Sequence, residues 1–347
     1  MFKDIDYEEL ENGFNKEEVL FVDVRSPKEF EEYTIPGAIN MPILNDEERE
    51  EIGTIYVHES VEKAKRMGLE VASKKLLYIY DKIKELEKSY KHIVLFCARG
   101  GLRSSVITMM LFSLGAKVYK LKGGYKGYRA FVNKKLPLVN EEANYVVLQG
   151  NTGVGKTKIL KELKKRGYNI LDLEGCANHR GSLLGSVGIG KGNRQKKFES
   201  LIYEELKNSK GNLFFVEGES KRIGNAIIPD CIYNKMRVSK RILVKADIDY
   251  RAKVIMEEYT KRENYKEEIS SALNSLEKYI KRENIDRYLK MVSEDNCIEV
   301  AKELMLKYYD PMYENGEKKY EYVLELIDSD VNRICDKIEE NINRITI

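Results

Sequence analysis

The stretch Tyr145-Val-Val-Leu-Gln-Gly-Asn-Thr-Gly-Val-Gly-Lys-Thr157 decides how the second half of the chain folds. It starts with a short apolar run typical of a buried strand and ends with a match to every fixed position of G-x-x-x-x-G-K-[ST]. Lys158–Lys165 continues as a basic helix pattern. Because the motif lies between a strand and a helix, we predict a loop whose backbone N–H groups cradle a di- or triphosphate.

The motif gives each of its fixed residues a role. The glycines let the backbone approach a phosphate closely, the lysine neutralises its charge, and the threonine hydroxyl can hold Mg²⁺. The diphosphate-binding candidates are therefore Gly150, Gly153, Gly155, Lys156 and Thr157, with Thr157 as the magnesium ligand.

Polar side chains follow the next two predicted strands, Asn169–Leu173 and Leu213–Val216. In a parallel sheet, ligands bind at the carboxyl ends of the strands, so carboxylates there can lie on the metal side of the phosphate loop. A glycine-flanked loop after the first of these strands adds a histidine and an arginine. Each of these polar residues can alternatively be an ordinary loop residue that binds no ligand. The polar and metal-side candidates are Asp172, Glu174, His179, Arg180, Glu217 and Glu219.

Charge is distributed unevenly along the chain. The formal net charge is only +3, but residues 1–60 hold 5 basic and 17 acidic side chains, a balance of −12, which leaves +15 for the rest. The run Lys191-Gly-Asn-Arg-Gln-Lys-Lys197 is part of this basic excess. It is either a solvated face or a surface that contacts RNA phosphates, with Arg194, Lys196 and Lys197 as the candidate residues.

A second chemical site is predicted where the strand Lys91–Phe96 ends in Cys97-Ala-Arg-Gly-Gly-Leu-Arg-Ser104 and a helix begins. Loop N–H groups and the helix N-terminus converge there and favour a thiolate, so Cys97 is the catalytic candidate. Arg99 and Arg103 add positive charge, and Gly100 and Gly101 permit the turn, which makes these four residues candidates for binding an oxyanion. The alternative is a buried structural cysteine.

Strand and helix patterns alternate along the chain, which predicts an α/β fold in two parts. The first, residues 1–135, contains the cysteine loop, and the second, residues 136–347, contains the phosphate loop and turns helical beyond about residue 250. Residues 134–144, with Pro137, are the predicted linker, after a glycine-rich turn at residues 123–127.

Composition excludes several classes of protein. No apolar stretch approaches the roughly 20 residues that a bilayer requires, and the acidic start of the chain is unlike a secretory signal. The five cysteines are widely spaced and odd in number, which argues against a disulfide framework and for a reducing cytoplasm. We therefore expect a cytoplasmic protein that does not bind a membrane.

The cysteine-containing part resembles the rhodanese family. The resemblance rests on Phe21-Val-Asp-Val-Arg-Ser-Pro-Lys-Glu-Phe30, Thr34-Ile-Pro-Gly-Ala-Ile-Asn40, the Cys97 loop and Gly115 to Gly124. Tyr33-Thr34 stands where the family often has Gly-His. Rhodaneses carry sulfur or selenium on this cysteine.

A rhodanese-like part fused to a phosphate-loop part resembles the tRNA 2-selenouridine synthase family over nearly the whole chain to about residue 325. The further segments that carry this resemblance are Asp46-Glu-Glu-Arg-Glu-Glu-Ile-Gly-Thr54, Leu173-Glu-Gly-Cys-Ala-Asn-His-Arg-Gly-Ser182 and Val216-Glu-Gly-Glu-Ser220. The last two are the most specific, because ordinary P-loop proteins lack them.

The resemblance implies a two-step transferase acting on tRNA that carries 2-thiouridine at the wobble position. The sulfur is first geranylated by geranyl diphosphate, and selenophosphate then replaces the geranylthio group to leave 2-selenouridine. The implied cofactor is Mg²⁺, bound at the phosphate loop. The implied protein partner is an enzyme that supplies selenophosphate. The sequence does not locate the groove for the geranyl chain.

Three other functions stay open at this stage. The chain can be an NTP-dependent kinase or NTPase with a regulatory rhodanese domain, or a non-catalytic RNA-binding or sulfur-relay module. Cys97 to Arg103 also has the C-x5-R spacing of cysteine phosphatases with a rhodanese-like fold.

Overall fold

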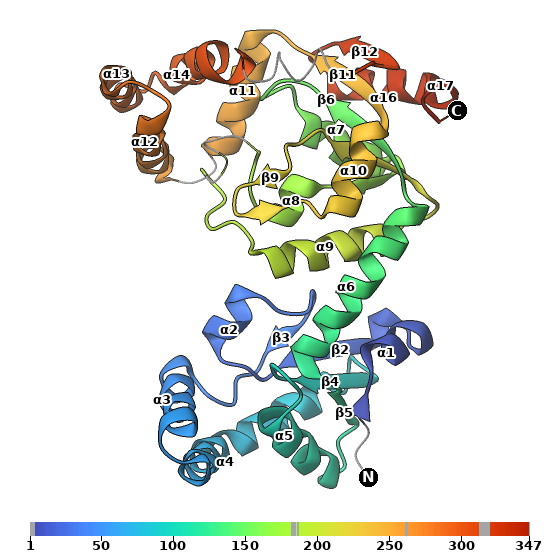
Figure 1. The fold of residues 1–347 in the computed structure, drawn as a ribbon, viewed down its shortest axis with the longest axis vertical. Coiled ribbons are helices and arrows are strands. Elements are labelled where there is room, and N and C mark those ends of the chain that lie inside the picture. The colour runs from blue at the N-terminus through green and yellow to red at the C-terminus, as the bar shows by residue number, and fades with distance from the viewer. Residues whose placement is uncertain (1–3, 182–184, 186, 261–262, 312–319, 347) are drawn as a thin grey trace. The chain divides into compact units, whose positions relative to one another are not determined.

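The computed structural model describes residues 4–181, 185, 187–260, 263–311 and 320–346. The chain divides into two compact units, Met1–Leu136 and Pro137–Ile347. Each is built on its own five-stranded parallel sheet with helices on both faces, so the expected two-part α/β fold is confirmed (Figure 1). Among the helices in these ranges, none combines the length and the apolar character needed to cross a bilayer.

The first unit has the strand order β1-β5-β4-β2-β3. Its strands are β1 Asp4–Ile5, β2 Val19–Asp23, β3 Ile39–Asn40, β4 His92–Phe96 and β5 Val118–Leu121. Its helices are α1 Tyr7–Gly13, the 3₁₀ turn η1 Lys16–Glu18, α2 Pro27–Glu32, α3 Asp46–His58, α4 Val61–Leu86, α5 Leu102–Ser113 and α6 Gly124–Glu142. The central strands β2 and β4 are almost continuously apolar, as strands covered on both faces must be.

Helices α4 and α5 cover one face of this sheet. Ile79 and Ile83 of α4 and Ile107 of α5 share a buried cluster with strand residues such as Leu95. On the other face, Tyr7 of α1 packs against Tyr128 of α6, with ring centroids 4.7 Å apart, and against Phe21 of β2. The carboxyl ends of β2 and β4 therefore lie side by side between these layers, with Asp23 paired to Phe96, and Cys97 follows directly.

The second unit has the strand order β12-β11-β6-β8-β7. Its strands are β6 Asn144–Gln149, β7 Asn169–Leu171, β8 Leu213–Glu217, β11 Lys240–Lys245 and β12 Leu324–Ile327, with a small hairpin of β9 Arg222–Ile223 and β10 Ala226–Ile227. Its helices are α7 Lys156–Lys165, α8 Leu173–Ala177, α9 Gln195–Lys207, α10 Asp230–Val238, α11 Ile248–Tyr259, α12 Tyr265–Ser275, the 3₁₀ turn η2 Leu276–Lys278, α13 Arg282–Ser293, α14 Cys297–Leu304, the π-helical turn η3 Met305–Tyr309, α16 Val331–Glu340 and α17 Ile342–Thr346.

A helical layer extends this unit beyond the sheet. Helices α11 to α14 and η3 form their own apolar cluster, which includes Ile255, Leu273, Tyr288 and Leu304. This layer is the helical region expected beyond residue 250. The sequence analysis did not find β12, which is only four residues long and returns the chain to the sheet beside β11.

The predicted linker at residues 134–144 was wrong, because helix α6 continues through most of it. Pro137 lies inside this helix and removes one backbone donor. Burial on both sides offsets that loss: Leu136 is buried, and the buried Asn140 donates to the carbonyl of Cys231 and accepts from Tyr145. The predicted glycine-rich turn is also shorter than expected, since α6 already begins at Gly124.

The predicted strand Asn169–Leu173 was wrong in its last two residues. The strand ends at Leu171, and Asp172 caps the short helix α8 by accepting from the backbone N–H of Gly175 at 2.6 Å. An aspartate at this position stabilises the start of a helix more than it stabilises a strand. Glu174 therefore sits on a helix turn instead of a strand end.

Candidate active sites

The phosphate loop connects β6 to α7 through glycines that no other residue can replace without strain. Gly153 and Gly155 have φ of +85° and +87°, in the left-handed region that favours glycine. A Cβ on Gly153 would lie 2.6 Å from the carbonyl oxygen of Arg251, and one on Gly150 would clash with the carbonyl of Val244. The loop is thus packed against β11 and α11.

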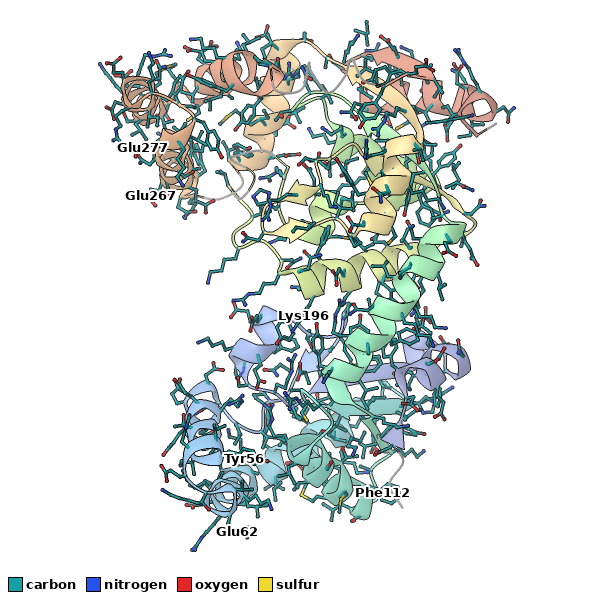
Figure 2. All side chains as sticks on the ribbon, viewed as in Figure 1. Tyr56, Glu62, Phe112, Lys196, Glu267 and Glu277 are labelled. Carbon is teal, nitrogen blue, oxygen red and sulfur yellow. The ribbon has the colours of Figure 1, made fainter. Side chains whose placement is uncertain are left out.

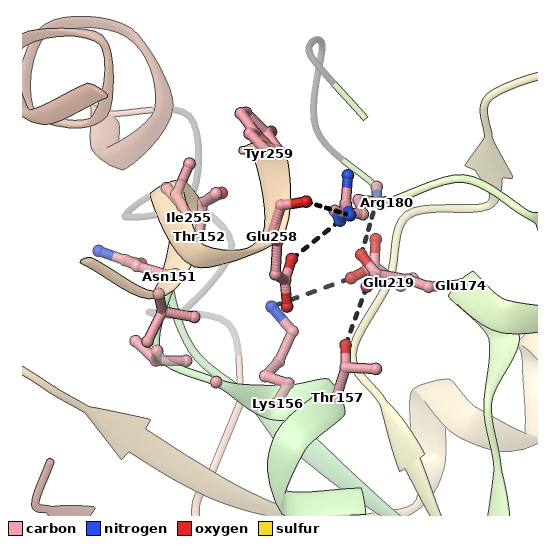
Figure 3. A pocket seen from close by; sticks show the side chains of 15 residues that line it. Asn151, Thr152, Lys156, Thr157, Glu174, Arg180, Glu219, Ile255, Glu258 and Tyr259 are labelled. Atoms are coloured by element: carbon pink, nitrogen blue, oxygen red, sulfur yellow. Dashed lines mark hydrogen bonds and ion pairs between the residues drawn. The ribbon is translucent and has the colours of Figure 1, made fainter. Parts of the chain in front are cut away.

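Lysine and threonine at the end of the loop face two carboxylates (Figure 3). Lys156 Nζ donates to the carbonyl of Gly150 at 3.0 Å and lies 3.9 Å from Oε1 of Glu219. Thr157 Oγ1 donates to Oε2 of Glu174 at 3.0 Å. Lys156, Thr157, Glu174 and Glu219 all line one pocket.

Sheet order brings these carboxylates to the loop. Strand β8 pairs directly with β6, so that Leu148 is opposite Glu217, and β7 is the next strand outward. The residues after β8 and β7 therefore emerge beside the phosphate loop. This is the reason why both Glu219 and Glu174 reach it although they are 45 positions apart.

Glu217 and Asp172 are not among the residues that line the pocket. Glu217 is fully buried and accepts from the backbone N–H of Leu173 at 3.0 Å. Burial, reinforced by the charges of Asp172, Glu174 and Glu219, raises the pKa of Glu217 well above its usual range. A neutral Glu217 would hold the start of α8, which positions Glu174.

His179 and Arg180 follow α8 and take different positions. His179 packs against the hairpin turn, where a Cβ on Gly224 would lie 2.7 Å from its ring, and burial lowers its pKa. It does not line the pocket. Arg180 does: its Nε lies 2.8 Å from Glu258 Oε2, and its guanidinium stacks over Tyr259 at 5.1 Å. Ser182, the last residue of the family-specific segment that begins at Leu173, lies outside the described residues.

The oxygen donors at the loop suit a hard cation. The Thr157 hydroxyl and the carboxylates of Glu174 and Glu219 surround the same pocket. Over the part of the chain that the structure describes, no cluster of three or more His, Cys, Asp or Glu residues could hold a metal alone. That combination fits Mg²⁺, which is usually held by a few protein oxygens together with substrate phosphates and water.

Glu219→Gln is expected to flatten the pH dependence of stability. Burial and the charge of Glu174 raise the pKa of Glu219 from 4.5 to about 7, against the opposing charge of Lys156. Between these values the folded state keeps a proton that the unfolded state has released, so the free energy of unfolding falls as pH rises. In the variant, the free energy of unfolding should decrease by roughly 3 kcal/mol less over this pH range than in the wild type.

The measurement is urea unfolding at intervals from pH 4.5 to 8 in the absence of ligand. Glu257→Gln is the matched control, because Glu257 is an exposed partner of Lys158. Identical pH slopes for the wild type and Glu219→Gln would refute the raised pKa.

Cys97 lies at the carboxyl end of β4 and is buried. Its Sγ is 3.2 Å from Oγ of Ser104, on the first turn of α5. Burial opposes ionisation of the thiol, but hydrogen bonds from Ser104 and from the backbone of Arg99, with the charge of Arg103, bring the net pKa of Cys97 below its ordinary value. The thiol of Cys97 therefore ionises more readily than an ordinary cysteine, in the direction that its setting in the sequence predicts.

The two arginines of the cysteine loop differ in their surroundings. Arg99 is exposed at the tip of the loop. Arg103 is half-buried and forms a bidentate pair with Glu29, with Nη1 to Oε2 at 2.6 Å, and Arg49 lies 3.6 Å from the same oxygen. In a C-x5-R phosphatase this arginine would bind the phosphate; here it is committed to a carboxylate.

Gly100 and Gly101 shape the cysteine loop, and Gly124 supports it from behind. Gly100 has φ of +66°, and Gly101 is the N-cap of α5. A Cβ on Gly124 would clash with the carbonyl of Cys97 and the N–H of Gly100. The backbone N–H of Tyr125 donates to the same carbonyl at 2.9 Å. The start of α6 is therefore part of the loop's wall.

Gly124→Ala is expected to destabilise the first unit by about 3 kcal/mol. Roughly 1 kcal/mol comes from φ of +56°, and about 2 kcal/mol comes from the clash with the Cys97 loop. Gly115→Ala is the matched control, since Gly115 has φ of +79° but open space around its Cα, so that only the first contribution applies. Urea unfolding of both variants measures the difference; equal losses would refute the packing argument.

Sequence reasoning missed Ser104 as a partner of Cys97 and Arg251 as a support of the phosphate loop. Arg251 is buried, donates from Nε to the carbonyl of Thr152 at 2.9 Å, and pairs bidentately with Asp310. Ser104 was within the quoted motif and could have been found as a hydroxyl in the first turn of the helix that follows the cysteine loop. Nothing local marks Arg251 or Asp310, because their pairing spans 59 positions.

The basic candidates lie at the start of α9. Arg194 is its N-cap, and Lys196 and Lys197 occupy its first turn, with Lys196 exposed (Figure 2). Cations at this end of a helix oppose the helix dipole, so their positive potential adds to that of the helix N-terminus. No acidic residue occupies that turn.

Comparisons with known proteins agree with this division of the chain. A family model of the tRNA 2-selenouridine synthase AAA domain matches residues 143–344, and a model of the rhodanese-like domain matches residues 6–131. A tRNA 2-selenouridine synthase of Nitrosomonas europaea is 33% identical over 69% of this chain and 63% of its own length. That of Hydrogenovibrio crunogenus is 28% identical over 87% of this chain and 90% of its own length, and that of Pseudomonas syringae pv. tomato is 30% identical over 85% and 88%. With a phosphate loop, a cysteine loop and these relatives, the chain belongs to the tRNA 2-selenouridine synthase family.

Proposed function

We propose that this protein converts 2-thiouridine at the tRNA wobble position into 2-selenouridine, through geranylation and then selenation. The observation that carries the proposal is the presence of two anion-binding loops with different chemistry. One is a phosphate loop with Lys156 and Thr157 facing carboxylates, and the other is a buried cysteine with a lowered pKa. Membership of the family supplies the substrate class.

In the first step the phosphate loop would bind geranyl diphosphate. The sulfur of 2-thiouridine attacks the first carbon of the geranyl group, the bond from that carbon to the bridging oxygen breaks, and pyrophosphate leaves. The ring nitrogen N3 loses its proton to water in the same step. Lys156 and the loop N–H groups stabilise the charge that develops on the leaving group. Mg²⁺ held by Thr157 and the neighbouring carboxylates would supply further charge neutralisation when bound.

In the second step the Cys97 loop would bind selenophosphate, an anion. S-geranyl-2-thiouridine, selenophosphate and water give 2-selenouridine, geranylthiol and phosphate, because selenium replaces the geranylthio group and water takes up the phosphoryl group. The exposed Arg99 would attract the anion. The Cys97 thiolate would attack phosphorus, so that the phosphorus–selenium bond breaks and hydroselenide leaves to displace the geranylthio group, and water would then hydrolyse the sulfur–phosphorus bond to release phosphate.

The tRNA itself would be attracted by basic side chains. Arg194, Lys196 and Lys197 at the start of α9 add their charge to the positive end of that helix. Binding through phosphates is salt-dependent, so the affinity for tRNA should fall steeply with salt concentration.

The test is mass spectrometry of nucleosides from 2-thiouridine tRNA incubated with the enzyme, Mg²⁺, geranyl diphosphate and selenophosphate. S-geranyl-2-thiouridine should accumulate without selenophosphate, and 2-selenouridine should form when it is present. If neither nucleoside is formed, the proposed function is wrong. Multiple turnover of ATP or GTP without tRNA would instead support an NTPase.

A further inference from the structure

Glu29 is the carboxylate that pairs with Arg103 of the cysteine loop. It lies on α2, which follows β2, and β2 pairs with β4, so the start of α2 and the Cys97 loop emerge at the same edge of the sheet. Both terminal nitrogens of Arg103 donate to this carboxylate, Nη1 to Oε2 at 2.6 Å and Nη2 to Oε1 at 3.3 Å. The guanidinium of the loop is therefore held by a residue from another element.

Two further contacts fix Glu29 in this position. Its Oε2 accepts from the backbone N–H of Ser26 and completes the capping box of α2. Arg49 of α3 lies 3.6 Å from the same oxygen. Burial opposes ionisation, but the bonds from Arg103 and Ser26 bring the pKa of Glu29 below its usual value. A charged carboxylate is thus in place before any ligand enters the loop.

Arg103 is close enough to the loop to act on an anion bound there. It lies in the first turn of α5, directly after the loop, and its charge is one of the causes that lower the pKa of Cys97. A free guanidinium so placed forms strong, charge-assisted bonds with an oxyanion. The bidentate pair with Glu29 competes with those bonds, because an anion must either displace the carboxylate or bind without Arg103.

We propose that Glu29 is a positioning residue that holds Arg103 off oxyanions in the Cys97 loop and thereby keeps the affinity of this loop for phosphate low. The inference rests on the proposed function for the identity of the product, since the second step releases phosphate at this loop. A loop with a free arginine would retain that phosphate and delay the next turnover. Glu29 favours release of the product, while the charge of Arg103 still acts on the thiol.

The test is a titration of the full-length protein, labelled with ¹⁵N-glycine, with inorganic phosphate. The amide signals of Gly100 and Gly101 report binding at the Cys97 loop, and those of Gly150, Gly153 and Gly155 report binding at the phosphate loop. Glu29→Gln should lower the Kd at the Cys97 loop by roughly 10-fold, because glutamine leaves the charge of Arg103 unpaired. The Kd at the phosphate loop should stay the same.

Glu48→Gln is the matched control. Glu48 is likewise the third residue of a capping box, on α3, and it pairs with one cation, Lys75, at 2.8 Å. The side chains of Glu29 and Glu48 are 24% and 27% exposed, so both substitutions remove one charge from a similar environment. Glutamine is also suited to this position of a capping box, so both helices should keep their caps. Glu48→Gln should change the Kd at the Cys97 loop by less than about twofold.

The double variant Glu29→Gln/Arg103→Ala tests whether Glu29 acts through Arg103. Its Kd for phosphate at the Cys97 loop should return to the wild-type value or exceed it. A gain in affinity that survives the loss of Arg103 would overturn the inference, as would equal Kd values for the wild type and Glu29→Gln. A defect that is merely structural would not tighten binding at one loop and leave the other unchanged.

A second measurement uses tRNA that already carries S-geranyl-2-thiouridine. Added phosphate should inhibit selenation by Glu29→Gln at a roughly 10-fold lower concentration than in the wild type, and equal inhibition would contradict the inference. The two readouts also separate this inference from the proposed function, because the titration contains neither tRNA nor selenophosphate. Tighter phosphate binding by Glu29→Gln in a protein that forms no 2-selenouridine would overturn the proposed function and support the role of Glu29.

Discussion

Lys156→Ala is expected to reduce geranylation of 2-thiouridine tRNA by roughly 10³-fold. The ammonium group lies within the phosphate loop and lines the pocket that would hold the leaving pyrophosphate. Its loss removes charge stabilisation from the transition state, 3.9 Å from the carboxyl group of Glu219. Single-turnover formation of S-geranyl-2-thiouridine, followed by mass spectrometry, measures the effect.

Lys158→Ala is the control for this experiment. Lys158 lies on the same helix two residues later, but it pairs with Glu257 on the surface and does not line the pocket. It should keep nearly full geranylation activity. Supplying tRNA that already carries S-geranyl-2-thiouridine should restore selenation to Lys156→Ala. Full geranylation by Lys156→Ala would show that the phosphate loop serves another reaction.

Cys97→Ser is expected to abolish selenation, by more than about 10³-fold, while geranylation continues. A serine hydroxyl has nearly the same size but does not ionise in this environment, so the hydrogen bonds and positive charge that lower the pKa of Cys97 have no anion to stabilise. The variant should accumulate S-geranyl-2-thiouridine when both co-substrates are present. Unfolding of the first unit alone would give the same accumulation, so the urea midpoint of that unit is measured as well and should match that of the wild type.

Cys231→Ser is the matched control. Cys231 is a free, half-buried thiol, and burial raises its pKa instead of lowering it. Cys231→Ser should not accumulate S-geranyl-2-thiouridine, and the ratio of the two products should be the same as in the wild type. Normal selenation by Cys97→Ser would refute the assignment of the second step to this loop.

Local motifs allowed most of the two sites to be anticipated. The phosphate loop and the Cys97 loop each consist of contiguous residues whose glycines, cations and flanking strand prescribe one geometry. The sequence also placed carboxylates near the phosphate loop, because strand ends in a parallel sheet share an edge. It did not distinguish Glu219, which reaches Lys156, from Glu217, which turns into the core, since that choice depends on packing beneath the loop.

Features that depend on contacts between residues far apart in the chain could not be predicted from the sequence. The pairing of Arg251 with Asp310 joins helices separated by a long stretch of chain, and no spacing rule relates them. Pro137 indicated a break, but the surrounding tertiary contacts keep α6 helical through it. The apolar cluster of the helical layer likewise arises only when α11, α12 and α14 assemble, and each of these helices taken alone looks like an ordinary amphipathic helix.

The contact of Arg251 with the phosphate loop has a consequence for heat inactivation. Helices that open locally take their contacts with them, and a layer docked on the outside of a sheet can open before the sheet itself unfolds. If α11 opens, Thr152 loses its anchor and the phosphate loop loses its shape, although β6 and α7 remain folded. Geranylation would then fail at a lower temperature than selenation, and a warmed enzyme would still complete tRNA that had already been geranylated.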